Sequence, residues 1–144
     1  YTLGSPLTIA SDTTTSLSNN ANSGVSTQLP SDAITFWNNT TNKLVGVNNG
    51  DKYDIEIRFK AKSSSDNDSF SISIDIGGAL GVLNKKTCIF VKAANTEQDF
   101  AEPLQYYTGS TFLNNGGDIS ITAGTGNLSI YDISFLLTRT HKGI

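Results

Sequence analysis

The sequence predicts an all-β fold, an antiparallel β-sandwich of the jelly-roll type with about eight strands in a single domain, residues 1–144. Apolar and polar residues alternate strictly in two runs, residues 53–61 and 70–76. Since successive side chains of a strand point to opposite faces, each run has one buried and one wet face. This pattern is typical of antiparallel sheets packed on one side. Turn-forming residues recur about every 8–12 residues, as expected of short strands, and about eight strands indicate a jelly roll.

The composition fits one packed domain. A domain of 144 residues buries roughly 68–70% of its unfolded surface, enough for a core without cross-links. Hydrophobic residues make up 37% of the chain, charged residues 16% and aromatic residues 9%, with a net charge of −3. A disordered chain would combine high net charge with few aromatic residues. The mild acidity also argues against nucleic acid as a partner, because phosphate binding needs clustered Lys and Arg.

The single cysteine, Cys88, excludes an intrachain disulfide. It lies in the apolar run 87–91, which predicts a small buried side chain. A nucleophilic role would need a histidine nearby, and the one histidine, His141, lies in a charged tail segment. No apolar stretch approaches the roughly 20 residues of a membrane helix, so no membrane insertion is expected. The first residues show no signal-peptide pattern.

The first half of the chain contains four predicted strands. They span residues 2–10, 33–37, 43–47 and 52–61. Leu7 and Ile9 share one face of the first strand. Residues 11–32 are rich in Ser, Thr and Asn and read as a long surface connection, with room for one edge strand near Val25–Leu29. The Asn-Gly pair at 49–50 accepts positive φ and is typical of a turn.

The second half contributes the remaining strands. They span residues 69–76, 86–92, 98–107 and 118–123, followed by a final strand that begins at residue 128. The run 86–92 has few polar positions, which predicts a central strand. Pro103 cannot donate a ladder hydrogen bond, so its strand lies at an edge or carries a bulge.

The final strand changes the parity of its apolar residues. Leu128 and Ile130 share one face, whereas Ile133, Phe135 and Leu137 share a face of the other parity. A bulge near Tyr131-Asp132 would bring both sets to the core. The alternative is a strand that is apolar on both faces at 133–137, as expected where a second subunit covers the outer face.

No catalytic, cofactor or metal site is predicted. Asp66-Asn67-Asp68 offers oxygen ligands for calcium but lacks the 12-residue loop with its distal Glu, so a solvated turn is favoured. The glycines at 116–117 and 124–126 lack the Lys of a phosphate loop and are interpreted as turn residues. Glu97, Asp99 and Glu102 are interpreted as a solvated strand face, and the tail around Arg139, His141 and Lys142 as exposed.

Aromatic residues give the candidates for binding. For Tyr106, Tyr107 and Trp37, core or interface packing is favoured, and stacking on sugar rings is the alternative. Adjacent tyrosines in a strand point opposite ways, so one is expected in the core and the other exposed or at an interface. The interface candidates are Tyr106, Tyr107, Phe135 and Leu137. Together with the apolar run 133–137 they predict a homotrimer, since a lone sandwich would expose an apolar patch.

Four segments form a pattern shared with a known group of proteins. They are Ile34-Thr35-Phe36-Trp37-Asn38 with Asn42-Lys43, Gly50-Asp51-Lys52-Tyr53, residues 107–117, and residues 134–142, which end Thr138-Arg139-Thr140-His141-Lys142. This pattern resembles small β-sandwich virion proteins of tailed bacteriophages, especially marine ones. The resemblance implies a jelly roll like that of tumour necrosis factor and complement C1q heads, usually trimeric, and it carries over no catalytic residue.

The function implied by the resemblance is that of a non-enzymatic structural virion protein on the virion surface. A capsid decoration or stabilising protein is favoured, because the chain has no heptads or collagen-like repeat of a fibre stem. Its partners would be its own copies and other virion proteins such as the major capsid protein. The alternative is a tail fibre, spike or needle head that binds host surface glycans. A glycan hydrolase is disfavoured because no motif places an acid pair.

Overall fold

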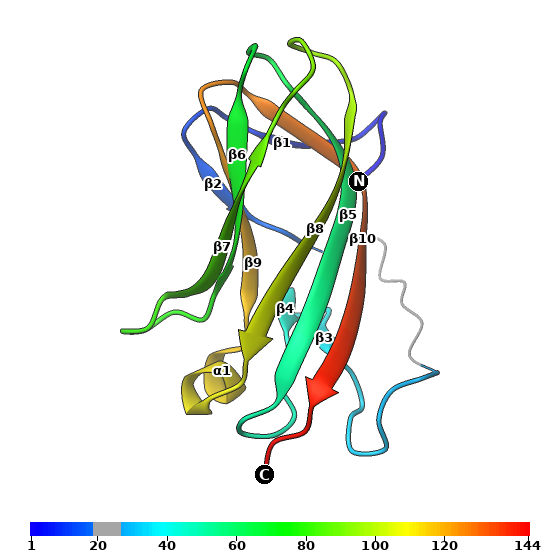
Figure 1. The fold of residues 1–144 in the computed structure, drawn as a ribbon, viewed down its shortest axis with the longest axis vertical. Helices are drawn as coiled ribbons and strands as arrows, with labels where there is room; N and C mark the ends of the chain where they lie inside the picture. The colour runs from blue at the N-terminus through cyan, green and yellow to red at the C-terminus, as the bar shows by residue number, and fades with distance from the viewer. Residues whose placement is uncertain (19–26) are drawn as a thin grey trace.

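The computed structural model describes residues 1–18 and 27–144 and contains two antiparallel sheets packed face to face (Figure 1). In chain order its elements are β1 (Leu7–Ile9), β2 (Thr14–Ser16), β3 (Trp37–Asn38), β4 (Lys43–Leu44), β5 (Lys52–Ser63), β6 (Ser69–Asp75), β7 (Val82–Ile89), β8 (Gln98–Tyr107), α1 (Ser110–Asn115), β9 (Asp118–Ala123) and β10 (Leu128–His141). The edge strand expected near Val25–Leu29 falls partly outside the described residues, and residues 27–29 form no strand.

The order of the strands is that of a jelly roll. One sheet has the order β1-β10-β5-β8 and the other the order β2-β9-β6-β7, and every neighbouring pair is antiparallel. Most connections therefore cross from one sheet to the other, as in two interlocked Greek keys. The predicted fold class is confirmed, and eight strands build the sandwich while β3 and β4 form a separate hairpin.

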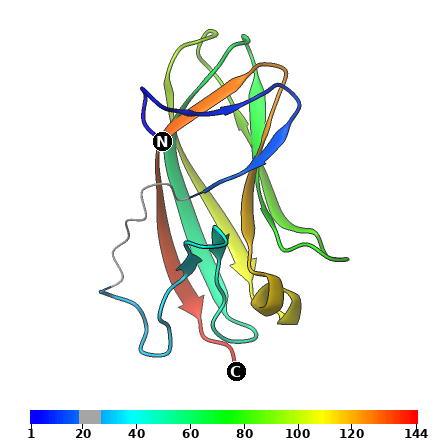
Figure 2. The same cartoon turned by 180° about the vertical axis from the view of Figure 1, so that it is seen from behind.

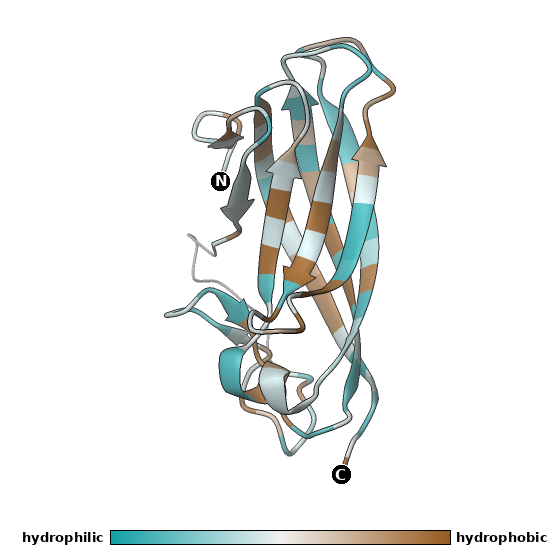
Figure 3. Cartoon of the chain, turned by 90° about the vertical axis from the view of Figure 1, so that its left-hand side faces the viewer, coloured by the Kyte–Doolittle hydropathy of each residue, from teal (hydrophilic) through white to brown (hydrophobic). Residues whose placement is uncertain are grey.

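The core lies between the two sheets and contains the alternating residues of β5 and β6. The buried set includes Tyr53, Ile55, Ile57, Phe59, Phe70, Ile72, Ile74 and Ile76, as predicted. Figure 3 shows the resulting bands of hydrophobic and hydrophilic residues along the strands. Phe59, Phe70, Phe90 and Phe100 form one aromatic cluster with ring centroids 5.0–5.8 Å apart. Cys88 is buried beside this cluster, in agreement with its prediction.

The hairpin β3–β4 and helix α1 cover parts of the sandwich. The hairpin lies on the side that carries β1 and β2, opposite β7 and β8 (Figure 2). Its Trp37 ring lies 5.4 Å from that of Phe135. Helix α1 was not predicted, because six residues are too few to show helical periodicity; it buries Phe112 and ends at Gly116, whose φ of 71° suits glycine.

The bulge predicted in the last strand is present in β10. The register with β5 shifts between Tyr131 and Ser134, and Asp132 has a φ of 52°. Leu128 and Ile130 before the shift are buried, and Ile133, Phe135 and Leu137 after it pack against the same core. The bulge interpretation is therefore confirmed. Leu136 points the other way and is 61% exposed.

The positions of the edge strands confirm one prediction and correct another. Pro103 lies on β8, which is an edge strand, as predicted. The run 86–92 does not form a central strand, because it belongs largely to β7, an edge strand of the sheet β2-β9-β6-β7. Its apolar residues do not all face the core, since Ile89 is 63% and Val91 84% exposed. A short apolar run alone does not separate a central strand from an edge strand with apolar residues facing water.

Two buried aspartates hold the loops at the ends of the sandwich. Asp68, predicted in a solvated turn, is buried and accepts hydrogen bonds from the Ser63 hydroxyl and from the N–H groups of Thr125 and Gly126, the last two at 2.9 and 3.1 Å. Burial raises its pKa, but these donors outweigh burial and hold the pKa below the ordinary value. The prediction was wrong for Asp68 because it ignored loops distant in sequence.

Asp51 is the buried aspartate that joins loops at the other end of the sandwich. It is fully buried and accepts hydrogen bonds from the Tyr53 hydroxyl at 2.7 Å, from the N–H of Gly143 at 2.7 Å and from the N–H of Asn48 at 3.0 Å. Burial raises its pKa, and these hydrogen bonds lower it below the ordinary value. The last residues of the chain are thereby joined to the turn before β5.

Truncating a core residue of β5 or β6 tests the register. Ile57→Ala or Ile74→Ala should lower the free energy of unfolding by about 2–5 kcal/mol, because each leaves a cavity in the core. Urea denaturation followed by circular dichroism measures this. The exposed Ser134→Ala variant serves as the control and should unfold like the unmodified protein. An unchanged midpoint for both isoleucine variants would contradict the register.

The buried carboxylates predict acid sensitivity. Because the folded-state pKa values of Asp51 and Asp68 are depressed, their stabilisation is complete above the unfolded-state pKa of about 4 and is lost as the pH falls further. Asp68→Asn should cost about 1–3 kcal/mol at pH 7 and flatten this acid dependence. Urea denaturation between pH 7 and pH 2 measures both effects. The exposed Asp99→Asn variant should keep the acid dependence of the unmodified protein; an equal slope in Asp68→Asn would refute the assignment.

Candidate functional site

The outer face of β10, β5 and β8 carries a regular array of polar side chains. These strands pair so that their outward residues lie in rows across the sheet. The rows are Tyr131–Lys60–Asp99, Ser134–Arg58–Ala101, Leu136–Glu56–Pro103 and Thr138–Asp54–Gln105, with Lys52–Tyr107 beyond them. We call this surface the β5 face. A central line of charged side chains on β5 is flanked by side chains of β8 and β10 that are uncharged except for Asp99.

Between positions 54 and 60, the outward charges of β5 are segregated by sign. Lys60 and Arg58 lie in one half, and Glu56 and Asp54 in the other. Arg58 forms an ion pair with Glu56 where the halves meet. Exposed ion pairs add little to stability, about 0–1 kcal/mol each, so these side chains remain available to a ligand.

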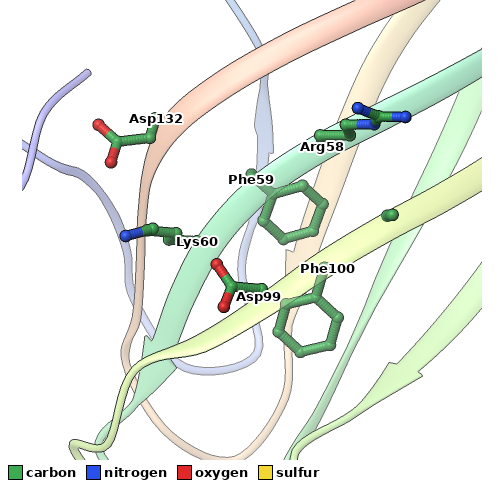
Figure 4. Close-up of a pocket in the computed structure, with 7 residues that line it drawn as sticks. Arg58, Phe59, Lys60, Asp99, Phe100 and Asp132 are labelled. Carbon is green, nitrogen blue, oxygen red and sulfur yellow. The ribbon is translucent and has the colours of Figure 1, made fainter.

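One hollow of this face, called the first hollow below, lies beside the bulge. It is lined by Arg58, Phe59, Lys60, Asp99, Phe100, Ala101 and Asp132. In Figure 4, Lys60, Asp99 and Asp132 lie to one side of the strands, whereas the rings of Phe59 and Phe100 lie to the other. The small Ala101 leaves the space, and the bulge places Asp132 at its border.

A fixed polar cluster adjoins this hollow. Glu97 pairs with Lys60 at 3.2 Å and accepts a hydrogen bond from the Tyr131 hydroxyl. The bond from Tyr131, followed by that from Lys60, lowers the pKa of Glu97. Burial, together with the bond to Glu97, raises the pKa of Tyr131 to about 12. Glu97 is therefore charged at neutral pH, where it pairs with Lys60.

The second hollow lies in the next rows of the same face. It is lined by Asp54, Ile55, Glu56, Pro103, Leu104, Gln105, Leu136 and Thr138. The Oδ1 atom of Asp54 is buried and accepts no hydrogen bond from the described residues. A buried carboxylate oxygen without a donor is unfavourable, by about 1–3 kcal/mol or more. A ligand that donates a hydrogen bond in this hollow would relieve that cost.

The predicted interface tyrosines separate as expected for neighbours in a strand. Tyr107 lies on the β5 face, 61% exposed, with the Lys52 ammonium 5.8 Å from its ring centre. Tyr106 is buried between the rings of Tyr53 and Phe112, at 5.0 and 4.9 Å. Burial raises the pKa of Tyr106 and removes its side chain from the surface. Tyr106 is thus a core residue, and its place among the interface candidates is corrected.

Phe135 and Leu137 are half-buried against the core after the bulge. The residue between them, Leu136, is the exposed one. The bulge turns Phe135 and Leu137 toward the core, so the residue of this segment that is available to an interface is Leu136 and not the two predicted ones. The homotrimer itself remains a prediction.

Trp37 packs as favoured by the sequence, whereas part of the basic tail differs from its prediction. Trp37 is partly buried, and its ring packs on that of Phe135. Arg139 is not an exposed tail residue, since it pairs with Asp32 at 2.7 Å and with Asp51 at 3.4 Å. The bond to Asp32 raises the pKa of Arg139. His141 and Lys142 are exposed, as expected.

The hollows contain residues that the sequence did not single out as a site. Asp54, Gln105 and Thr138 come from three strands far apart in the chain. The alternation of β5 in the sequence predicts that Asp54 points outward. The strand order β10-β5-β8, which brings the three residues together, could not be predicted from the sequence.

Within residues 1–18 and 27–144, no group of three or more His, Cys, Asp or Glu side chains is placed to hold a metal ion. The described helix α1 is too short to cross a membrane, and no other described helix could do so. The expectations of no cofactor and no membrane insertion remain predictions.

No protein-family model matches the sequence, and no curated protein sequence matches it. Among the solved structures similar to this chain is one described as "CBM4 structure and function", with a TM-score of 0.44 and 16% sequence identity, covering 65% of this chain and 69% of that chain. We draw no conclusion about ligands or assembly from a similarity of this extent.

Proposed function

We propose that this chain is a non-catalytic module that binds a glycan through the β5 face, in the manner of a phage fibre or spike head that recognises a host surface polysaccharide. The observation that carries the proposal is the unpartnered Oδ1 of Asp54 in a hollow of that face. Binding sites combine apolar surface with a few well-placed polar groups, and this hollow has both.

The neighbours of Asp54 match the chemistry of a sugar. A hydroxyl of the ligand donates to Asp54, while the Gln105 amide and the Thr138 hydroxyl both donate and accept. Leu136 and Pro103 offer apolar surface to the C–H face of a ring. The two hollows lie in successive rows of the same strands, so the face suits an extended chain better than a single sugar.

Glycan binding is tested by screening the labelled protein on a glycan array and measuring the best ligand by calorimetry. Asp54→Ala and Gln105→Ala should each weaken binding about tenfold or more, a loss of about 1.4 kcal/mol, because each removes a hydrogen-bonding partner in the second hollow. Ser134→Ala is the matched control, since it lies on the same face but lines neither hollow. Absence of any array ligand, or equal affinity in all three variants, would overturn the proposal.

We also propose a second function, capsid decoration on the virion surface, in which the chain binds other virion proteins such as the major capsid protein. The observation that favours it is the exposed apolar set on and beside β7. This set contains Leu80, Val82, Leu83, Ile89 and Val91. Exposed apolar surface of this kind is typical of protein contacts.

Decoration predicts a stabilised particle. Particles that lack the protein should release their contents at a lower temperature, and adding the pure protein should restore the original value, because binding to the intact lattice stabilises it by mass action. Thermal release of nucleic acid, followed by a fluorescent dye, measures this. Particles of equal robustness that fail to adsorb to cells would favour glycan recognition instead.

A further inference from the structure

The four edge strands of the sandwich are not equally protected from pairing with another chain. An unprotected edge offers unpaired N–H and C=O groups to a further strand, and proteins commonly protect edges by short strands, prolines or charges. β1 and β2 contain three residues each, and β8 carries Pro103. β7 has eight residues and no proline. It also lies on the side away from the β3–β4 hairpin (Figures 1 and 2).

The hydrogen bonds of β7 show which backbone groups face outward. The Phe90 N–H bonds to the Asp68 carbonyl at 2.9 Å, toward β6. The Ile89 carbonyl accepts from the Gln98 side chain at 3.2 Å, away from β6. Because these directions alternate along a strand, the N–H and C=O groups of Lys85 and Thr87 also point away from β6. None of the described residues forms a hydrogen bond with them.

The charges on β7 select what can pair there. Residues 79–96 contain Lys85, Lys86 and Lys92 and no acidic residue, in a chain of net charge −3. In an antiparallel pairing centred on Lys85, a second copy of β7 would bring Lys85 opposite Lys85, and like charges directly opposite each other are destabilising. Lys86 forms an ion pair, at 2.6 Å, with Glu102 of the other sheet, whereas Lys85 is exposed. The edge therefore disfavours its own copy and favours a strand with carboxylates.

We propose that the free edge of β7 binds an extended acidic segment of a partner protein, which adds as a further strand beside Lys85 and Thr87. Backbone hydrogen bonds supply the affinity of such strand addition. A carboxylate opposite Lys85 supplies its selectivity, and Ile89 gives apolar side chains a contact. The inference is independent of glycan binding, which uses the other sheet.

The test uses a capped nine-residue peptide in which valine and glutamate alternate, and a twin with lysine in place of glutamate. The glutamate peptide should slow amide hydrogen exchange of Lys85 and Thr87 at least tenfold, measured by NMR. Lys85→Glu should weaken binding of the glutamate peptide at least tenfold and create binding of the lysine peptide. Lys62→Glu, a charge reversal on β5, is the control and should bind like the unmodified chain.

Three results would overturn the inference. One is that neither peptide slows the amide hydrogen exchange of Lys85 and Thr87, although circular dichroism shows that the unmodified chain and its variants are folded. Another is equal binding of the glutamate peptide to Lys85→Glu. The third is protection of these amides without peptide, with a mass by light scattering above the 15.3 kDa of one chain, which would assign the edge to a second copy.

Discussion

The bulge in β10 is the constraint on which both the core and the candidate site depend. A regular strand presents residues of one parity to one face, yet β10 carries apolar residues of two parities. The extra residue at the bulge, with Asp132 at a φ of 52°, lets Ile130 and Phe135 lie on the same side of the sheet. Without it, half of β10 would expose its apolar side chains, and a one-residue slip would have the same effect.

The same irregularity shapes the outer surface. It carries Asp132 to the border of the first hollow and puts Leu136 on the β5 face. Bulges commonly re-aim side chains beside functional sites. The hollow thus arises from a feature that the core already requires, so its backbone is held by the packing of β10 on β5.

Buried carboxylates complete the framework where strands cannot. Asp68 accepts hydrogen bonds from residues 63, 125 and 126, and Asp51 from residues 48, 53 and 143. Each therefore joins loops that are distant in the sequence. Charge-assisted bonds to N–H groups are stronger than neutral ones, and a buried charge is tolerated because every bond is made. These hydrogen bonds therefore stabilise the loops at both ends of the sandwich.

The sequence predicted what depends on local periodicity. The buried set of β5 and β6, the bulge near Tyr131 and the edge position of Pro103 all follow from the alternation of neighbouring residues or from the chemistry of one residue. Asp68, Arg139 and Tyr106 were placed wrongly or only in part, because their environment is built from segments far apart in the chain. The second hollow could not be predicted for the same reason: Asp54 and Gln105 become neighbours only once β5 pairs with β8.

The two proposed surfaces lie on different sheets and adjoin at the side of the sandwich, where the Asn84 side chain donates to the Gln105 carbonyl at 2.8 Å. The β5 face belongs to the sheet β1-β10-β5-β8, whereas the free edge of β7 belongs to the other sheet. Lys86 and Glu102 link β7 to β8 across the side of the sandwich, so a strand added to β7 would lie beside β8 and leave the outward residues of β5 uncovered. A chain attached to a larger assembly through β7 would therefore still present its glycan-binding face to the surroundings. Attachment and recognition then depend on different strands. Variants of Lys85 and Asp54 should affect them independently, because the two residues lie on different sheets and share no hydrogen-bonding or ion-pair partner among the described residues.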